Sequence, residues 1–212
     1  MARVRKVISR STCKVVYKFP SIKLGRMVYC ESGLELDYAF LLDPDRGVIS
    51  FQEQPGKIKY YLGGKLHRYT PDFLVIRPHK KQIVEVKPRS KAFTEENRVL
   101  FGIIKAICLK SGYEFIVVTD KEIREGVRLS NVKALWKYGR TLISPRHHIY
   151  CQEFFSQNSR ATLGELFAFF ACRGEGRGVV FSLLYWGVVG IDIELPLTTQ
   201  SPVHLPASTS RT

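Results

Sequence analysis

The spacing of hydrophobic residues divides the first part of the chain into alternating helices and strands. Helical spacing predicts helices over residues 32–42, 95–112 and 131–138. Short runs rich in β-branched and aromatic residues predict strands over residues 48–54, 57–62, 69–76, 82–87 and 115–119. The run at 115–119 is continuously apolar up to its last residue, which is typical of a strand buried on both faces. This order predicts an α/β fold with a mixed sheet flanked by helices.

Helical and strand patterns resume after Pro145 and predict a second unit. Thr162-x-x-Glu165 matches a helix capping box, a helical pattern follows it, and residues 179–186 form another. Residues 188–195 alternate as a strand, so the outline is that of a small winged-helix domain. The predicted organisation is a basic arm at 1–27, an α/β domain at 28–144, the winged-helix-like domain at 145–196 and an unstructured Ser/Thr/Pro-rich tail at 197–212.

Two of the predicted strands fit together as a hairpin that carries charged side chains. A loop of two or four residues between them places Asp72 opposite Glu85, with the side chains about 5 Å apart on one face. Lys87 lies two residues beyond Glu85 and shares that face, whereas the neighbouring valines point into a core. Two carboxylates and a lysine therefore converge, with apolar residues behind them.

Such a pair of carboxylates suggests a metal site. The two groups repel each other unless a divalent cation lies between them, and oxygen ligands suit Mg²⁺ or Mn²⁺. Asp72 and Glu85 are the expected ligands, together with the main-chain carbonyl of Val86. Lys87 is placed to orient or deprotonate an attacking water, or to neutralise the transition state. The pattern indicates metal-dependent cleavage of a phosphodiester, and the plain alternative is an exposed hairpin with a surface ion pair.

The expected fourth member of the site is Glu35, on the first predicted helix. It lies beside the apolar stripe of that helix and is able to point along the sheet edge toward a second metal ion or its water shell. The alternative is that Glu35, as the third residue of a capping box, only accepts a hydrogen bond from the main-chain N–H of Ser32. Glu31 and Asp37 are rivals for the same role.

The net charge of +14 over 212 residues favours a polyanionic partner. No apolar run reaches the about 18 residues that span a bilayer, so nucleic acid is expected rather than a membrane. Five scattered cysteines without a Cys-x-x-Cys pair indicate buried thiols in a reducing cytoplasm. The basic residues that surround the proposed centre in sequence, as DNA phosphate contacts or as a solvated face, are Lys57, Lys59, Lys65, Arg68, Lys80, Lys81, Arg89 and Lys91.

Four blocks of the sequence together resemble one nuclease family. They are Glu31-Ser32-x-x-Glu35, Phe51–Pro55, Arg68–Phe73 and Glu85–Pro88. From about Val28 to Val118 the chain resembles the TnsA family, the endonuclease subunits of heteromeric transposases within the PD-(D/E)xK nuclease superfamily. The resemblance implies a restriction-endonuclease-like fold, and weaker similarity from Thr162 to Val203 implies a winged-helix C-terminal domain.

The resemblance also implies a function. TnsA-like subunits nick the 5′ ends of a mobile element in double-stranded DNA, while an integrase-type transposase cuts and joins the 3′ ends and an AAA-type ATPase acts as regulator. The resemblance implies that Glu35, Asp72 and Lys87 are catalytic, with Mg²⁺ or Mn²⁺ as cofactor, in the nucleoid-associated cytoplasm of a bacterium. Some members have Gln at the position of Glu85, and the carboxylate here favours metal binding.

Three functional hypotheses follow. The first is a transposition nuclease that acts inside a complex, and the second is a stand-alone PD-(D/E)xK nuclease in repair, restriction or junction resolution. The third is a DNA-bridging subunit without activity, against which the intact set of Asp72, Glu85 and Lys87 counts. Asp192 and Glu194 in the last predicted strand would repel phosphates, so the C-terminal domain is expected to dock on a protein.

Overall fold

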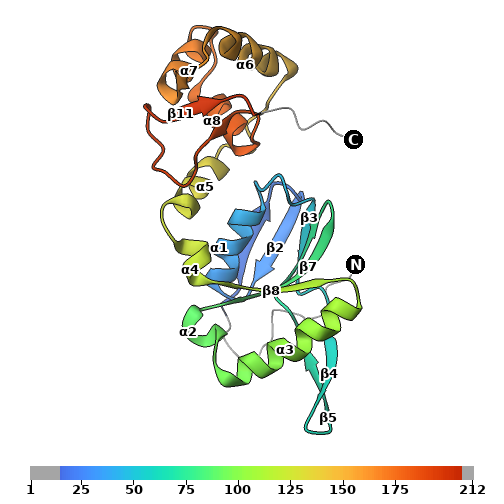
Figure 1. The fold of residues 1–212 in the computed structure, drawn as a ribbon. Helices are drawn as coiled ribbons and strands as arrows, with labels where there is room; N and C mark the ends of the chain where they lie inside the picture. Colours follow the sequence, from blue (N-terminus) through green and yellow to red (C-terminus); the bar gives the residue numbers. More distant parts are fainter. Residues whose placement is uncertain (1–14, 207–212) are drawn as a thin grey trace. The chain divides into compact units, whose positions relative to one another are not determined.

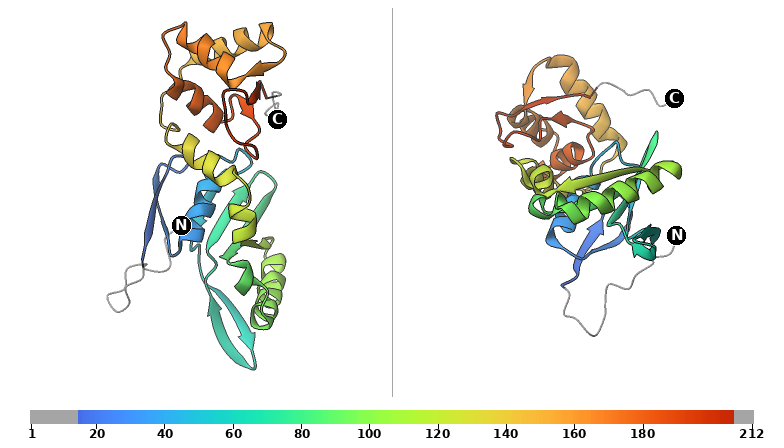
Figure 2. Two further views of the ribbon diagram at one scale, coloured as in Figure 1. Left: turned by 90° about the vertical axis from the view of Figure 1, so that its left-hand side faces the viewer. Right: turned by 60° about the horizontal axis from the view of Figure 1, so that its bottom comes forward.

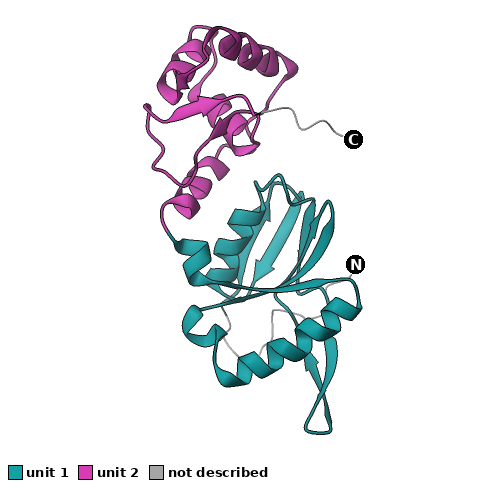
Figure 3. Ribbon diagram, in the orientation of Figure 1, with its two compact units in different colours: residues 1–125 teal, residues 126–212 magenta. Residues whose placement is uncertain are grey.

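The computed structural model describes residues 15–206 and divides the chain into two compact units, residues 1–125 and 126–212 (Figure 3). The first 14 residues of the predicted basic arm lie outside the described residues. The division falls between residues 125 and 126 rather than at 145. No helix within residues 15–206 is long and apolar enough to cross a membrane.

A four-stranded mixed sheet forms the centre of the first unit, in the order β3-β6-β7-β8 (Figure 1). β3, β6 and β7 are antiparallel neighbours, and β8 runs parallel to β7. The bounds of these strands are β3 Ser50–Glu53, β6 Phe73–Arg77, β7 Lys80–Lys87 and β8 Glu114–Thr119. The predicted mixed sheet is confirmed, although β8 is only partly buried and not enclosed on both faces throughout.

Helices cover both faces of this sheet (Figure 2). On one face, Tyr38 of α1 (Gly33–Leu42) packs edge-on against Phe73 of β6. On the other face, α3 (Glu95–Lys110) shares a hydrophobic cluster with the sheet, formed by Ile83, Phe101, Ile104, Cys108 and Phe115. Two short helices, α2 (Arg89–Ala92) and α4 (Asp120–Arg124), follow β7 and β8 and were not predicted. The mixed sheet flanked by helices is therefore as predicted.

A separate two-stranded ribbon extends beyond the central sheet (Figure 1, Figure 2). It consists of β4 (Ile58–Leu62) and β5 (Lys65–Tyr69), joined at Gly63-Gly64. The prediction of one strand over residues 69–76 is wrong, because β5 ends at Tyr69 and β6 begins only at Phe73. Pro71 lies in the break and has no main-chain N–H to donate to a strand partner.

The predicted arm contains regular structure within the described residues. β1 (Tyr17–Ser21) and β2 (Arg26–Cys30) form an antiparallel hairpin, in which Phe19 and Val28 face each other and are completely buried. The arm was predicted from its charge, but these buried residues alternate with more exposed ones and turn inward against α1. The arm prediction is therefore wrong from residue 17 onward.

The second unit combines four helices with a three-stranded sheet in the order β10-β11-β9. The elements are α5 Arg128–Trp136, α6 Pro145–Gln157, β9 Ala161–Thr162, α7 Leu163–Ala171, α8 Arg177–Tyr185, β10 Gly190–Ile191 and β11 Pro202–His204. The predicted capping box at the start of α7 is confirmed, because the Thr162 side chain accepts from the Glu165 N–H and the Glu165 carboxylate accepts from the Thr162 N–H.

Two predictions about this unit are wrong, and one helix was missed. α6 was not predicted, the strand expected over 188–195 is reduced to β10, and β11 lies in the segment expected to be an unstructured tail. α5 belongs to this unit because the Asn131 amide donates to the main-chain oxygens of Ile193 (2.9 Å) and Leu195 (2.8 Å). These contacts join segments about sixty residues apart, which local patterns do not reveal. Of the described cysteines, Cys30, Cys108 and Cys151 are buried as expected and Cys172 is exposed.

Candidate active site

The β6–β7 hairpin has the predicted register. Phe73 pairs with Val84, and the Asp72 N–H donates to the Val84 carbonyl at 3.1 Å. Arg77 pairs with Lys80, so the loop has two residues. Asp72 therefore lies just before β6 at the position opposite Glu85, as the sequence predicts.

Glu85 is buried and both of its carboxylate oxygens have partners. The Lys87 ammonium lies 2.6 Å from Oε1, and the Tyr69 hydroxyl at the end of β5 donates to Oε2. The same ammonium lies 5.5 Å from the centre of the Phe101 ring, which places Lys87 against the α3 side of the sheet. Val86 between them is buried on the opposite face. The predicted pairing of Glu85 and Lys87 on one face is confirmed.

Asp72 lies in a negatively charged environment. Burial raises the pKa of its carboxyl well above the usual range, and the neighbouring charges of Glu85 and Glu35 raise it further. The Val86 N–H, which donates to Oδ2 at 2.8 Å, and the charge of Lys87 partly oppose this effect. Three carboxylates, those of Asp72, Glu85 and Glu35, are thus within electrostatic reach of one another.

Glu35 at the start of α1 is both a helix-capping residue and a neighbour of this centre. Its Oε2 accepts from the Glu31 N–H at 2.7 Å and its Oε1 accepts from the Ser32 hydroxyl at 2.9 Å. The capping alternative expected Glu35 to accept from the Ser32 N–H, but the main-chain donor is Glu31. Burial raises the pKa of Glu35, and the charges of Glu31 and Glu85 act in the same direction. Of the rivals, Asp37 instead pairs with Arg124 at 2.7 Å.

Gln54 is connected to the centre by hydrogen bonds that the sequence did not reveal. Gln54 is 2% exposed, and its φ of 45° is the only positive value of a non-glycine residue within residues 15–206. Its N–H donates to the Asp72 carbonyl at 2.8 Å and its side-chain amide donates to Glu31 at 2.8 Å, while its Oε1 is buried without a hydrogen-bond partner. A strained, buried polar residue of this kind is typical of functional sites. In the sequence, the Gln54-Pro55 step at the end of the strand was the feature that pointed to this residue.

The metal prediction rests on the chemistry of the donors. Within residues 15–206, no three His, Cys, Asp or Glu side chains lie close enough together to hold a metal ion. The predicted set needs only two carboxylates, Asp72 and Glu85, with the main-chain oxygen of Val86. These are hard oxygen donors, and the charges of Glu85 and Glu35, which add to burial in raising the pKa of Asp72, are charges that a cation would offset. The donor set therefore fits Mg²⁺ or Mn²⁺.

The basic residues expected around the centre divide into two groups. Lys57, Lys59, Lys65 and Arg68 lie on or beside the ribbon, and Arg89 and Lys91 lie on α2, directly after Lys87. Lys80 and Lys81 lie at the opposite end of β7, six to seven residues and about 20 Å from Lys87. Lys80 is paired with Glu114 at 3.1 Å. Lys80 and Lys81 are therefore near the centre in sequence but lie away from it along β7, and their predicted contact with DNA stays a prediction.

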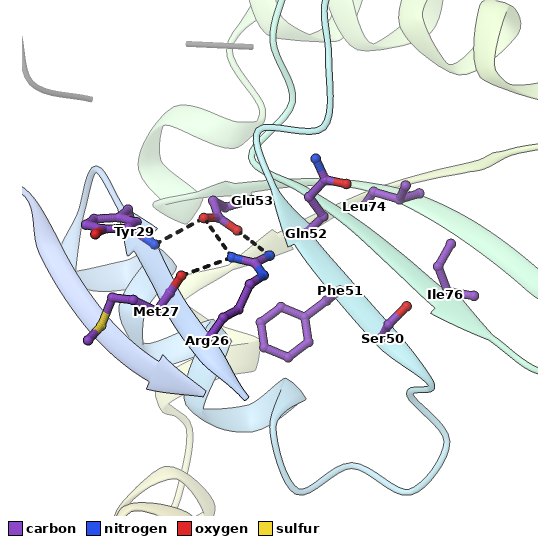
Figure 4. A pocket seen from close by; sticks show the side chains of 9 residues that line it. All are labelled: Arg26, Met27, Tyr29, Ser50, Phe51, Gln52, Glu53, Leu74 and Ile76. Atoms are coloured by element: carbon purple, nitrogen blue, oxygen red, sulfur yellow. Dashed lines mark hydrogen bonds and ion pairs between the residues drawn. The ribbon is translucent and has the colours of Figure 1, made fainter. Parts of the chain in front are cut away.

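A hollow of about 470 Å³ beside β2 and β3 is separate from this centre (Figure 4). The Arg26 guanidinium crosses it and binds both carboxylate oxygens of Glu53, at 3.1 and 2.8 Å. None of Glu35, Asp72, Glu85 and Lys87 lines it. The candidate catalytic side chains therefore do not open into this hollow.

Comparison with known protein families finds a match for the segment that contains Asp72, Glu85 and Lys87. Residues 45–120 match the family model described as TnsA-like endonuclease N terminal. The match runs from just before β3 to the end of β8, so it contains Gln54, Asp72, Glu85 and Lys87, whereas Glu35 precedes it. No curated protein matches the chain. The segment that holds the paired carboxylates and the lysine is therefore similar to the N-terminal domain of TnsA-like endonucleases.

Proposed function

We propose that this chain is the metal-dependent DNA endonuclease subunit of a transposase. It nicks the 5′ ends of a mobile element, so that the element is excised for cut-and-paste transposition. One observation carries the proposal: Asp72 lies opposite Glu85, whose carboxylate is 2.6 Å from the Lys87 ammonium, within a TnsA-like endonuclease segment.

Asp72, Glu85 and the main-chain carbonyl of Val86 would hold Mg²⁺ or Mn²⁺, and Glu35 would serve a second ion or the water shell. When bound, such an ion polarises the phosphate and lowers the pKa of a coordinated water. The two carboxylates come from one hairpin whose register is set by main-chain bonds, which favours a fixed distance between them.

The chain's own residues would orient the reactants and offset developing charge. Lys87 supplies an ammonium beside the scissile phosphate, where it orients the attacking water and neutralises charge on the transition state. Glu85 holds that ammonium, and the Tyr69 hydroxyl holds Glu85 from the other side. The Phe101 ring behind Lys87 restricts the positions that the ammonium can take.

The second unit is proposed to be a winged-helix domain that docks on protein partners. In support, α6, β9, α7, α8, β10 and β11 follow one another in the winged-helix order, and β11 lies between β10 and β9. Six of the nine residues of α8 are buried, and the exposed Asp192 and Glu194 are acidic, which disfavours binding of DNA phosphates. The proposed partners are an integrase-type transposase and an AAA-type ATPase, in the nucleoid-associated cytoplasm.

The test is strand cleavage at transposon ends by the complete assembly with Mg²⁺. Lys87→Ala is expected to reduce nicking of the 5′ ends at least about a hundredfold, while the partner's 3′ cuts continue. Lys105→Ala, which removes an exposed lysine of α3, is the matched control and should cut normally. Normal 5′ nicking by Lys87→Ala would contradict the proposal.

A stand-alone nuclease is the second candidate, because Asp72, Glu85, Lys87 and Tyr69 all come from one compact unit. Sustained cleavage of plain duplex DNA by the purified chain, without any partner, would favour that candidate. Cleavage only in the presence of the partner subunits would favour the transposition nuclease.

A further inference from the structure

The β4–β5 ribbon has two faces of different character. Ile58, Tyr60 and Tyr69 face inward and pack against the hydrophobic cluster of α3, β7 and β8. The pairs Lys59–Arg68 and Tyr61–Leu66 face outward. Tyr61 is 71% exposed and Leu66 is 50% exposed. The inward face is therefore held by the domain core, and the outward face is presented to solvent.

The charge of the ribbon has no internal counterpart. Residues 54–71 include three lysines and one arginine but no Asp or Glu. Lys59 and Arg68 lie directly opposite each other, an arrangement of like charges that destabilises a hairpin. Within the described residues, no carboxylate forms an ion pair with either of them. A polyanion would remove this repulsion.

The ribbon is also attached directly to the candidate active site. Tyr69, its last residue, donates to the Glu85 carboxylate, and Asp72 follows only three residues later. A ligand bound along the ribbon would therefore extend toward the Asp72 and Glu85 carboxylates. The paired segment of five residues on each strand is about 17 Å long, and a two-stranded ribbon fits the DNA major groove, which is about 12 Å wide.

We propose that the outward face of the β4–β5 ribbon seats duplex DNA, with the ribbon in the major groove and the scissile phosphate at Asp72 and Glu85. Lys59 and Arg68 contact backbone phosphates, and Tyr61 contacts the apolar surface of sugars or bases. This inference rests on the proposed nuclease function and names the surface that presents the DNA to it.

The test compares two pairs of substitutions in the full chain. Lys59→Ala with Arg68→Ala removes the outward cations of the ribbon, and Lys80→Ala with Lys81→Ala removes the same charge at the far end of β7. Binding to a fluorescent 30-base-pair duplex is measured in EDTA over a range of salt concentrations. The substitutions in the ribbon are expected to weaken binding about tenfold or more. They should also make the negative slope of log K against log salt shallower by about 2. The control pair should change neither quantity by a comparable amount.

Tyr61→Ser separates apolar contact from charge. It should lower the affinity without changing the salt slope, because no phosphate contact is lost. All three substituted ribbon residues are exposed, so thermal unfolding is expected to match that of the parent chain. The inference is overturned if the ribbon variant binds with the parental affinity and salt slope, or if both double variants lose the same affinity. It is also overturned if the parent chain shows no measurable binding.

The two proposals fail differently. If the ribbon pair loses binding but the parent assembly never nicks a transposon end, the nuclease function fails and the ribbon surface stands. If the parent assembly nicks and the ribbon pair binds and nicks equally well, the ribbon surface fails and the function stands.

Discussion

The Tyr69 hydroxyl donates a hydrogen bond to the Glu85 carboxylate, although β5 and β7 belong to different sheets. Burial raises the pKa of Tyr69, and the adjacent Glu85 charge raises it further, so the phenol stays protonated and acts as a donor at any working pH. Because Glu85 also accepts from Lys87, this bond joins the ribbon to the group that holds the candidate catalytic lysine.

Tyr69→Phe tests whether that bond positions Glu85. The substitution removes the donor and keeps the ring, which packs against Phe115. A hydrogen bond to a charged group contributes about 1.5–3 kcal/mol, so 5′ nicking is expected to fall about tenfold or more. Tyr60→Phe, which keeps the ring that stacks on His67, is the matched control. Nicking at the parental rate by Tyr69→Phe, at all Mg²⁺ concentrations, would show that the bond is only structural.

Asp72→Asn is expected to stabilise the metal-free protein while it abolishes nicking. The amide oxygen can still accept from Val86, but the buried charge, which Glu85 and Glu35 also repel, is gone. This should raise the free energy of unfolding by about 1 kcal/mol. Chemical denaturation in EDTA measures the difference.

The pH dependence of this difference has a definite sign. Since the pKa of Asp72 is raised in the folded state, the ionised carboxylate destabilises the fold at neutral pH, and protonation removes that cost as the pH falls. The advantage of Asp72→Asn should therefore be largest near pH 7 and shrink toward acid pH. A variant that is less stable than the parent chain at pH 7 would contradict the repulsion argument.

Glu35→Gln separates the capping role from the catalytic role. Glu165 occupies the same third position in the capping box of α7, so Glu165→Gln measures what the loss of a capping carboxylate costs on its own. Glu35→Gln is expected to suppress 5′ nicking and Glu165→Gln to leave it unchanged, with both lowering the melting temperature slightly. If Glu35→Gln lowers the melting temperature but nicks normally, Glu35 is only a capping residue.

Truncation tests the division between the units. A chain that ends at residue 125 retains the whole first unit, and it should fold cooperatively and still bind duplex DNA. A chain that ends at residue 144 keeps α5 but loses α8 and the carbonyls bound by Asn131, so it should expose the buried Val132 and Leu135.

The readouts are solubility, thermal unfolding and pull-down with the partner subunits. Both truncations should lose partner association to a greater extent than DNA affinity. Retained association in the chain that ends at residue 125 would show that the first unit carries the docking surface.

The local features of the site follow from the sequence. The register that sets Asp72 opposite Glu85 requires only a two-residue turn and strict alternation of side chains, and both are properties of neighbouring residues. The helix starts at Ser32 and Thr162 are equally local, because the N-cap bond at Ser32 and the capping box at Thr162 each span four residues.

The non-local features required the tertiary structure. Only the folded chain brings Glu35 within electrostatic reach of Asp72 and pairs β11 with β9 across some forty residues. These contacts close long loops, so they form only when burial elsewhere in the chain offsets the entropy that loop closure costs. The structure of the arm and of the tail was missed for the same reason, because both were judged from charge and composition alone. The sequence by itself determined which carboxylates and lysine share a face, since pleating alternates side chains residue by residue. The tertiary structure decided which distant groups surround them, because that choice depends on packing over the whole unit.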